Sequence, residues 1–221
     1  MKYTESWYMS LKKSKVVKTL AEKQQEFLRF LPDHMHEEFM MKSYIAGGAI
    51  FSLYNEEEPK DYDFFVTDEN FAIRLRNIFN LNSSLKYKNG IKIGTHDGET
   101  LIVTDNAVSI GQFQIITRWI GTPAEVISQF DFLHNMFYFY KGMVQNVANW
   151  KYLEEKTLHY NEKRARDICG TIIRTNKFVK RGFTITHGEM AKMLLKLHDV
   201  GFNERELEIL NSFDKRNDFE S

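Results

Sequence analysis

Two adjacent glycines, Gly47-Gly48, stand between two short apolar runs, and the second run begins at an Asp61-Tyr62-Asp63 triplet. The run over 43–46 ends at the glycines as a strand would, and the glycines permit the sharp turn into a helix over 49–54. Asp61 follows Gly48 by 13 residues and leads into an apolar strand over 62–66. Alternate residues of a strand share a face, so this pattern predicts that both carboxylates project together.

Carboxylates that share a face repel one another and lose solvation, and a bound divalent cation offsets both costs. Amides at a glycine turn that opens a helix can hold a phosphate group. Taken separately, the glycines are compatible with an ordinary tight turn and the aspartates with a solvated pair. Taken together, they predict a site for two Mg²⁺ ions at Asp61 and Asp63, with a nucleotide phosphate on Gly47 and Gly48.

The rest of the chain predicts an α+β fold, with a mixed-sheet catalytic domain and N-terminal helix over 1–147 and a small all-α domain over 148–221. Helical spacing and caps predict the helices, which are expected over 10–42 with a break at Pro32, 68–81, a short one after Thr122, 148–160, 162–180, 187–199 and 203–213. Asn89-Gly90 and Asp97-Gly98 are hairpin signals within a strand-rich stretch, and 113–119 is a further strand candidate.

Composition excludes several classes of protein. The 30 basic and 30 acidic residues cancel, so any nucleic-acid face must be local. Cys169 is the single cysteine, which rules out intramolecular disulfides and cysteine-rich zinc sites. His34 and His36 have no partner cluster for zinc. Without a signal peptide or an apolar run long enough for a membrane span, we expect a cytoplasmic protein with no membrane partner.

The stretch from Gly47 to Phe64, with Pro59-Lys60-Asp61 before the second aspartate, resembles the polymerase-beta-like nucleotidyltransferase superfamily. It is most similar to the head of CCA-adding tRNA nucleotidyltransferases and bacterial poly(A) polymerases. Two later segments extend this resemblance over about residues 43–185: 131–138 is similar to a nucleotide-contacting motif, and 173–183 to the neck helix of that family.

The resemblance implies roles for further residues. Asp131 is the candidate third catalytic carboxylate and metal ligand. Its alternative roles are a nucleotide contact or a carboxylate bonded to backbone. Asp97 and Glu99, which lie in a predicted hairpin turn, are the other candidates for the third carboxylate. Asn135 falls on the Asn of the nucleotide-contacting motif. The remaining candidates for contacts to the nucleotide are the basic residues Lys60, Arg174, Lys177 and Arg181. The last three form a basic stripe together with Lys180. The alternative is that this stripe is a solvated helix face without a ligand.

The chain also departs from the family pattern. Phe51-Ser52 replace an Arg-Asp pair, and Gln129-Phe130 replace arginines. Of the Asp and Arg with which the family reads the incoming base, at most the Asp is kept, as Asp167. We therefore expect transfer of a nucleoside monophosphate from an NTP to an acceptor hydroxyl with release of pyrophosphate, but no CCA addition. The expected acceptor is an RNA 3′ end, which is slightly favoured over a protein or a small molecule. The alternative is a catalytically degenerate domain that binds a nucleotide or a partner.

Overall fold

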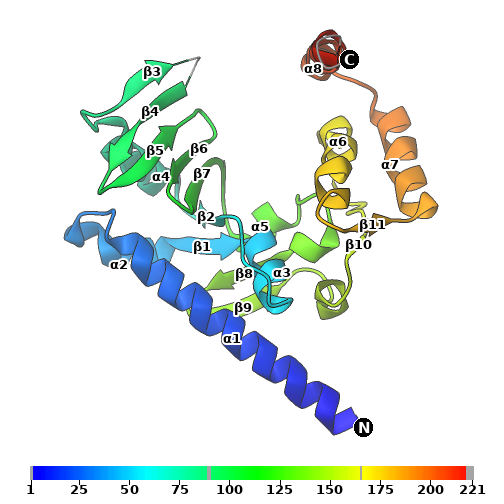
Figure 1. The fold of residues 1–221 in the computed structure, drawn as a ribbon, viewed down its shortest axis with the longest axis horizontal. Coiled ribbons are helices and arrows are strands. Elements are labelled where there is room, and N and C mark those ends of the chain that lie inside the picture. Colours follow the sequence, from blue (N-terminus) through cyan, green and yellow to red (C-terminus); the bar gives the residue numbers. More distant parts are fainter. Residues whose placement is uncertain (1, 89–90, 165, 218–221) are drawn as a thin grey trace. The chain divides into compact units, whose positions relative to one another are not determined.

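The computed structural model describes residues 2–88, 91–164 and 166–217 and divides the chain into two compact units (Figure 1). The sheet unit comprises residues 1–128 and 134–153, and the helical unit comprises 129–133 and 154–221. The predicted α+β class is confirmed. The two units meet in sequence after Leu153 rather than after residue 147. Leu153 stays with the sheet unit because its side chain is buried and its carbonyl accepts a hydrogen bond from Asn55.

A nine-stranded mixed sheet forms the centre of the sheet unit, with the strand order β3-β4-β5-β6-β7-β2-β1-β8-β9. All neighbouring strands run antiparallel except β2 and β7, which are parallel. The strands are β1 (Ser43–Ala46), β2 (Tyr62–Val66), β3 (Lys86–Lys88), β4 (Ile91–His96), β5 (Glu99–Val103), β6 (Ala107–Ile110), β7 (Phe113–Ile120), β8 (Phe137–Tyr140) and β9 (Met143–Asn146). The predicted strands over 43–46, 62–66 and 113–119 are therefore present.

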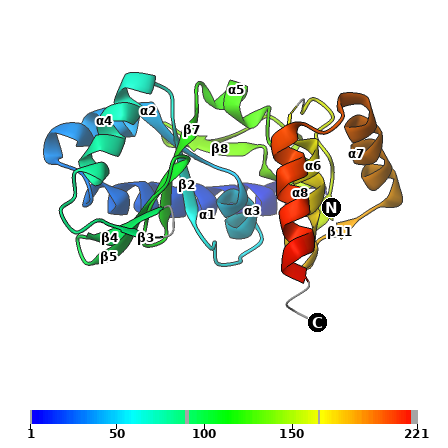
Figure 2. The same ribbon diagram turned by 90° about the horizontal axis from the view of Figure 1, so that it is seen from above.

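An aromatic layer holds one face of this sheet against three helices, α1 (Lys2–Leu28), α2 (His36–Lys42) and α4 (Glu69–Asn80). Phe27 of α1 lies with its ring centroid 4.9 Å from those of both Phe39 of α2 and Phe64 of β2. Figure 2 shows α2 and α4 near one another, and Arg74 of α4 pairs with Glu38 of α2. Burial of these large rings contributes to the apolar contact that stabilises the unit.

Several local predictions are confirmed by the helix ends. The helix expected over 10–42 is interrupted around Pro32, where a short 3₁₀ turn, Asp33–Met35, precedes α2. Asp68 caps α4 by accepting a hydrogen bond from the amide of Phe71 at 2.7 Å. Thr122 caps α5 (Pro123–Ile127) in a capping box with Glu125. Asn89-Gly90 lies outside the described residues, although β3 and β4 pair on either side of it.

The helical unit contains α6 (Ile168–Val179), α7 (His187–Val200) and α8 (Glu204–Asn217), with β10 (Thr157–Leu158) paired to β11 (Thr184–Ile185). The helix predicted over 148–160 is wrong, and the helix predicted over 162–180 begins only at Ile168. The chain there forms a 3₁₀ turn, Trp150–Leu153, and an extended stretch in which Tyr160 bridges to Phe132. None of the helices that the structure describes is both long enough and apolar enough to span a membrane.

Candidate active site

The glycine turn joins β1 to α3 (Gly48–Tyr54) at one end of the sheet. Gly47 has φ 89° and ψ −141°, a conformation that side chains rarely tolerate, and its amide donates to the carbonyl of Phe137 at 3.3 Å. This bond brings the segment that leads into β8 beside the turn. A Cβ on Gly48 would lie 4.0 Å from Oδ1 of Asn135. Asn135 and the two glycines, predicted from separate motifs, are therefore neighbours.

The aspartates lie on the strand next to β1. Ile45 of β1 pairs with Phe64 of β2, so the next residues along these antiparallel strands, Ala46 and Asp63, come opposite each other. Tyr62 and Phe64 are buried in the aromatic layer, whereas Asp63 is half-buried on the other face. Asp63 thus lies beside the start of the glycine turn, and Asp61 precedes the strand with its side chain half-buried.

Gln114 of β7, which sequence reasoning did not select, completes this part of the site. It is the register partner of Asp63, and its Nε2 donates to Oδ2 of Asp61 at 3.3 Å. Asp63 therefore lies between Ala46 on one flanking strand and Gln114 on the other. Only the β2–β7 pairing in three dimensions could reveal this residue.

The two aspartates have the chemistry to hold magnesium, because Mg²⁺ accepts one or two protein carboxylates and takes its other oxygens from water and phosphate. The buried Oδ1 of Asn135 accepts no hydrogen bond from a described residue, which leaves one polar atom beside the turn for a ligand. Within the described part of the chain, no group of three His, Cys, Asp or Glu side chains is placed to hold a metal. The two aspartates therefore fit a magnesium site in which phosphates of the substrate supply further ligands.

Asp131 lies in the helical unit, where its carboxylate is shared by two arginines. Its Oδ1 lies 2.8 Å from Nε of Arg164, and its Oδ2 pairs with Nε of Arg174 of α6. Thr171 donates a further hydrogen bond to Oδ1 at 2.9 Å. Asp131 lies outside the strands, and its carboxylate is fixed to Arg174 and Thr171 of α6. The role of Asp131 as a third metal ligand stays a prediction, as do its alternatives, a nucleotide contact and a carboxylate bonded to backbone.

Charge and burial act in opposite directions on the two arginines. Burial lowers the pKa of Arg164, and attraction to Asp131 opposes that effect. Burial also acts to lower the pKa of Arg174, but hydrogen bonds and charge attraction from Asp131 raise it overall. Arg174 also pairs with Asp167 at 3.0 Å. Arg164 pairs with the same Asp167 oxygen at 3.4 Å, so both arginines share two carboxylates.

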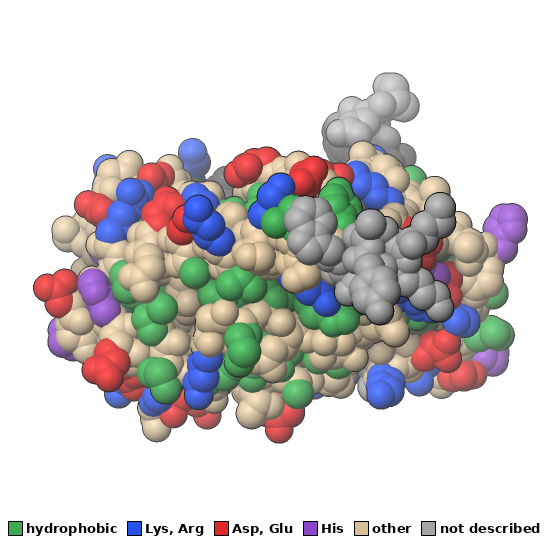
Figure 3. All heavy atoms as spheres, turned by 90° about the horizontal axis from the view of Figure 1, so that it is seen from below, with side chains coloured by type: hydrophobic (Ala, Val, Ile, Leu, Met, Phe, Trp, Pro, Cys, Tyr) green, Lys and Arg blue, Asp and Glu red, His purple; other side chains and the backbone are tan. Residues whose placement is uncertain are grey.

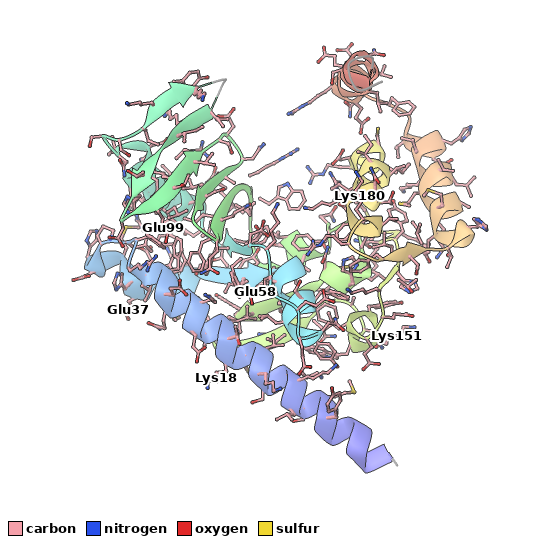
Figure 4. All side chains as sticks on the ribbon, viewed as in Figure 1. Lys18, Glu37, Glu58, Glu99, Lys151 and Lys180 are labelled. Carbon is pink, nitrogen blue, oxygen red and sulfur yellow. The ribbon has the colours of Figure 1, made fainter. Side chains whose placement is uncertain are left out.

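The other predicted contacts fall into the two units. Lys60 is exposed just before β2 in the sheet unit. Lys177, Lys180 and Arg181 are exposed at the end of α6 in the helical unit, and Figure 4 labels Lys180 there. On the face shown in Figure 3, basic and acidic side chains are interspersed, as the zero net charge implies. Any contact to a polyanion must therefore depend on a local group of cations.

Two solved structures share this fold. The first is described as the crystal structure of the Bacillus stearothermophilus CCA-adding enzyme in complex with CTP, with 17% identity and a TM-score of 0.52 over 76% of this chain and 42% of that one. The second, described as CCA-adding enzyme apo form II, has 15% identity and a TM-score of 0.53 over 84% and 47% of the two chains. This chain spans less than half the length of either. The nucleotidyltransferase fold is confirmed, and at such identity the likeness concerns the fold alone.

Sequence comparison gives a second finding. The profile of a family described as "Gad2: Gabija anti-defense 2 family protein" matches residues 18–164. That range contains the glycine turn, both aspartates, Gln114 and Asn135. Comparison with curated proteins gives no significant match.

Proposed function

The chain belongs to the Gabija anti-defense 2 family, and we propose that it acts as a metal-dependent nucleotidyltransferase. The reaction would move a nucleoside monophosphate from an NTP to an acceptor hydroxyl and release pyrophosphate. One observation carries this proposal: Asp63 lies opposite Ala46, immediately before the Gly47–Gly48 turn, on a nucleotidyltransferase fold.

The residues of the sheet unit would have separate roles in binding the triphosphate and the metal ions. The glycine turn lets the backbone approach the triphosphate, and Asn135 offers its buried Oδ1 to the nucleotide beside it. Asp61 and Asp63 would hold Mg²⁺, and Gln114 would keep Asp61 oriented. The ions, when bound, supply charge that activates the acceptor hydroxyl and stabilises the leaving pyrophosphate. In the helical unit, Asp131 keeps the Arg174 guanidinium in one orientation, from which it could contact a phosphate or a base.

The acceptor that we favour is an RNA 3′ end, with a hydroxyl of a protein or a small molecule as the alternatives. The description of the family as anti-defense proteins suggests that the acceptor belongs to a Gabija defence system. Such a reaction would take place in the cytoplasm, where NTPs are present.

A degenerate domain that binds a nucleotide or a partner without turnover is the second candidate. The observation in its favour is that Phe51 and Ser52, which replace a charged pair of the related enzymes, are buried in α3 with exposed fractions of 3% and 2%. No charged group of α3 therefore follows the glycine turn.

Incubation of the protein with each α-labelled NTP, Mg²⁺ and total cellular RNA and protein tests the proposal. We expect label in a product that mass spectrometry identifies as an added monophosphate, with equimolar pyrophosphate. Asp63→Asn should abolish both signals. Nucleotide binding without pyrophosphate release, under all four NTPs and with every acceptor fraction, would establish the degenerate domain instead.

A further inference from the structure

A row of side chains crosses the sheet from the aspartates to its far edge. Successive register pairs are Asp63 with Gln114, Gln114 with Ser109, Ser109 with Ile102, Ile102 with Ile93, and Ile93 with Lys86. Paired residues of neighbouring strands lie on the same face of a sheet. Asp63 and Lys86 therefore belong to one continuous face, which we call the open face.

The two faces of these strands differ sharply in burial. The alternate residues of β5, β6 and β7 are buried against the helices, and they are Leu101, Val103, Val108, Ile110, Phe113 and Ile115. On the open face, Ser109, Ile102 and Ile93 are half-buried and Lys86 is exposed. No described residue of the open face on β3 to β7 is fully buried. This face is available to a partner, whereas the opposite one forms the core.

The charges of the open face point to a polyanion. Lys86 and Lys88 alternate along edge strand β3 and so project on the same side, where both are exposed. Among the described residues of strands β2 to β7, Asp63 is the one acidic member of the open face. Glu99 of β5, which Figure 4 labels, lies on the opposite face, where it pairs with Arg29, the residue after α1, at 3.1 Å.

The span of the row fits an extended strand better than a single nucleotide. Five strand spacings separate β2 from β3, or about 24 Å at ~4.8 Å each. The glutamine and serine side chains along the row can bond riboses or bases, and its isoleucines can contact base faces. Such a surface is tolerant of sequence, as expected where cations at the rim hold phosphates.

We propose that the open face binds a single-stranded nucleic acid, with Lys86 and Lys88 on its phosphates and its 3′ end directed to Asp61 and Asp63. This inference rests on the proposed function for the role of the strand as acceptor. The binding itself does not depend on catalysis. Any protein partner would need acidic groups to meet the same lysines, and the experiment separates that case.

The test measures fluorescence anisotropy of a labelled oligouridylate of about 12 nucleotides, a length within the usual site sizes, with the full chain and no NTP. We expect Lys86→Gln/Lys88→Gln to weaken binding by about tenfold or more at low salt. Loss of two phosphate contacts should also reduce the slope of log Kd against log salt by about 1.4. Ser109→Asp, which puts a negative charge in the middle of the row, should weaken binding further.

Lys92→Gln is the matched control, because Lys92 pairs with Tyr87 on the neighbouring strand and projects to the opposite face. It should leave both affinity and slope unchanged. An unchanged Kd and slope in the double lysine variant would overturn the proposal. The proposal would also be overturned if the double lysine variant kept its oligonucleotide affinity but no longer labelled a protein acceptor. The open face would then bind a protein.

Asp63→Asn distinguishes the failure of this inference from failure of the proposed function. It should bind the oligonucleotide at least as well as the native protein but transfer no nucleotide. Lysine-dependent binding by a native protein that transfers nothing would retain the inference and reject the catalytic proposal. Transfer of nucleotide without lysine-dependent binding would reject the inference and keep the catalytic proposal.

Discussion

Gln114 donates a hydrogen bond from its amide to the carboxylate of Asp61 at 3.3 Å, from a position directly beside Asp63 on the parallel strand β7. Its side chain is neutral, so the candidate metal site in the sheet unit has two carboxylates and an amide. Affinity for the ion should consequently depend on the phosphates of the substrate.

Replacement of Gln114 by glutamate should tighten metal binding. The new carboxylate has nearly the same shape as the amide but adds a third negative charge beside Asp61 and Asp63. Like-charge repulsion should lower the Tm of metal-free protein, and added Mn²⁺ should raise it by more than in the native chain. Calorimetric titration with Mn²⁺ and thermal unfolding with and without the ion would check both effects. Equal Mn²⁺ affinity in the two proteins would contradict the placement of the site.

Asp63→Asn should reduce nucleotide transfer by about 100-fold or more, the scale of losing one electrostatic contact to the reacting charge. The side chain is half-buried and its shape is preserved, so thermal stability should change little. Steady-state release of pyrophosphate provides the measurement. Asp33→Asn, at a fully exposed side chain outside the site, should retain native activity.

The two glycines of the turn should respond differently to alanine. Gly47→Ala should destabilise the fold by about 1–3 kcal/mol, because its φ of 89° is strained for any side chain. A Cβ on Gly48 meets only Oδ1 of Asn135 at 4.0 Å, which is ordinary contact. Gly48→Ala should therefore keep native stability and still weaken NTP binding, since the methyl group occupies the space that a phosphate would approach. Urea unfolding and a nucleotide titration would separate the effects; native NTP affinity in Gly48→Ala would exclude the turn as a phosphate site.

Asp131→Asn should destabilise the helical unit by about 3 kcal/mol, because it leaves the Arg164 guanidinium, 4% exposed, without its closest carboxylate. Chemical unfolding would measure this change. Asp199→Asn removes a carboxylate with a 74% exposed side chain and should alter stability by less than about 0.5 kcal/mol. A variant of Asp131 with native stability would show that the two arginines do not depend on it.

Alkaline pH should destabilise the sheet unit through Tyr62. Burial raises the pKa of Tyr62 to about 12, with smaller effects from Glu58 and Glu26. Because the folded pKa lies above the unfolded value of about 10, the stabilisation is complete below pH ~10 and is lost as the pH rises towards ~12. Tyr62→Phe should show a shallower loss of unfolding free energy over this window. Unfolding in urea at several alkaline pH values would measure the difference, and parallel curves would contradict it.

Local sequence determined the elements that carry the site. Glycines allowed only a sharp turn after 43–46, and the alternation of Asp61, Tyr62, Asp63 and Phe64 fixed which side chains are buried on β2, because neighbouring residues of a strand face opposite ways. Caps at Asp68 and Thr122 were likewise readable, since a cap bonds to amides within three residues. Short-range geometry leaves few alternatives in such cases.

Only the tertiary structure decided which distant residues meet. Gln114 lies 53 residues from Asp61, and Arg174 lies 43 from Asp131. Strand order and register, rather than local preference, bring the first pair together, and burial of a shared carboxylate holds the second. The stretch 148–160 shows the same limit, because it forms a 3₁₀ turn and a bridge from Tyr160 to Phe132 instead of the helix that its spacing favoured. The sequence thus specified the aspartates and the glycine turn, while long-range pairing placed the neutral side chain of Gln114 beside Asp63.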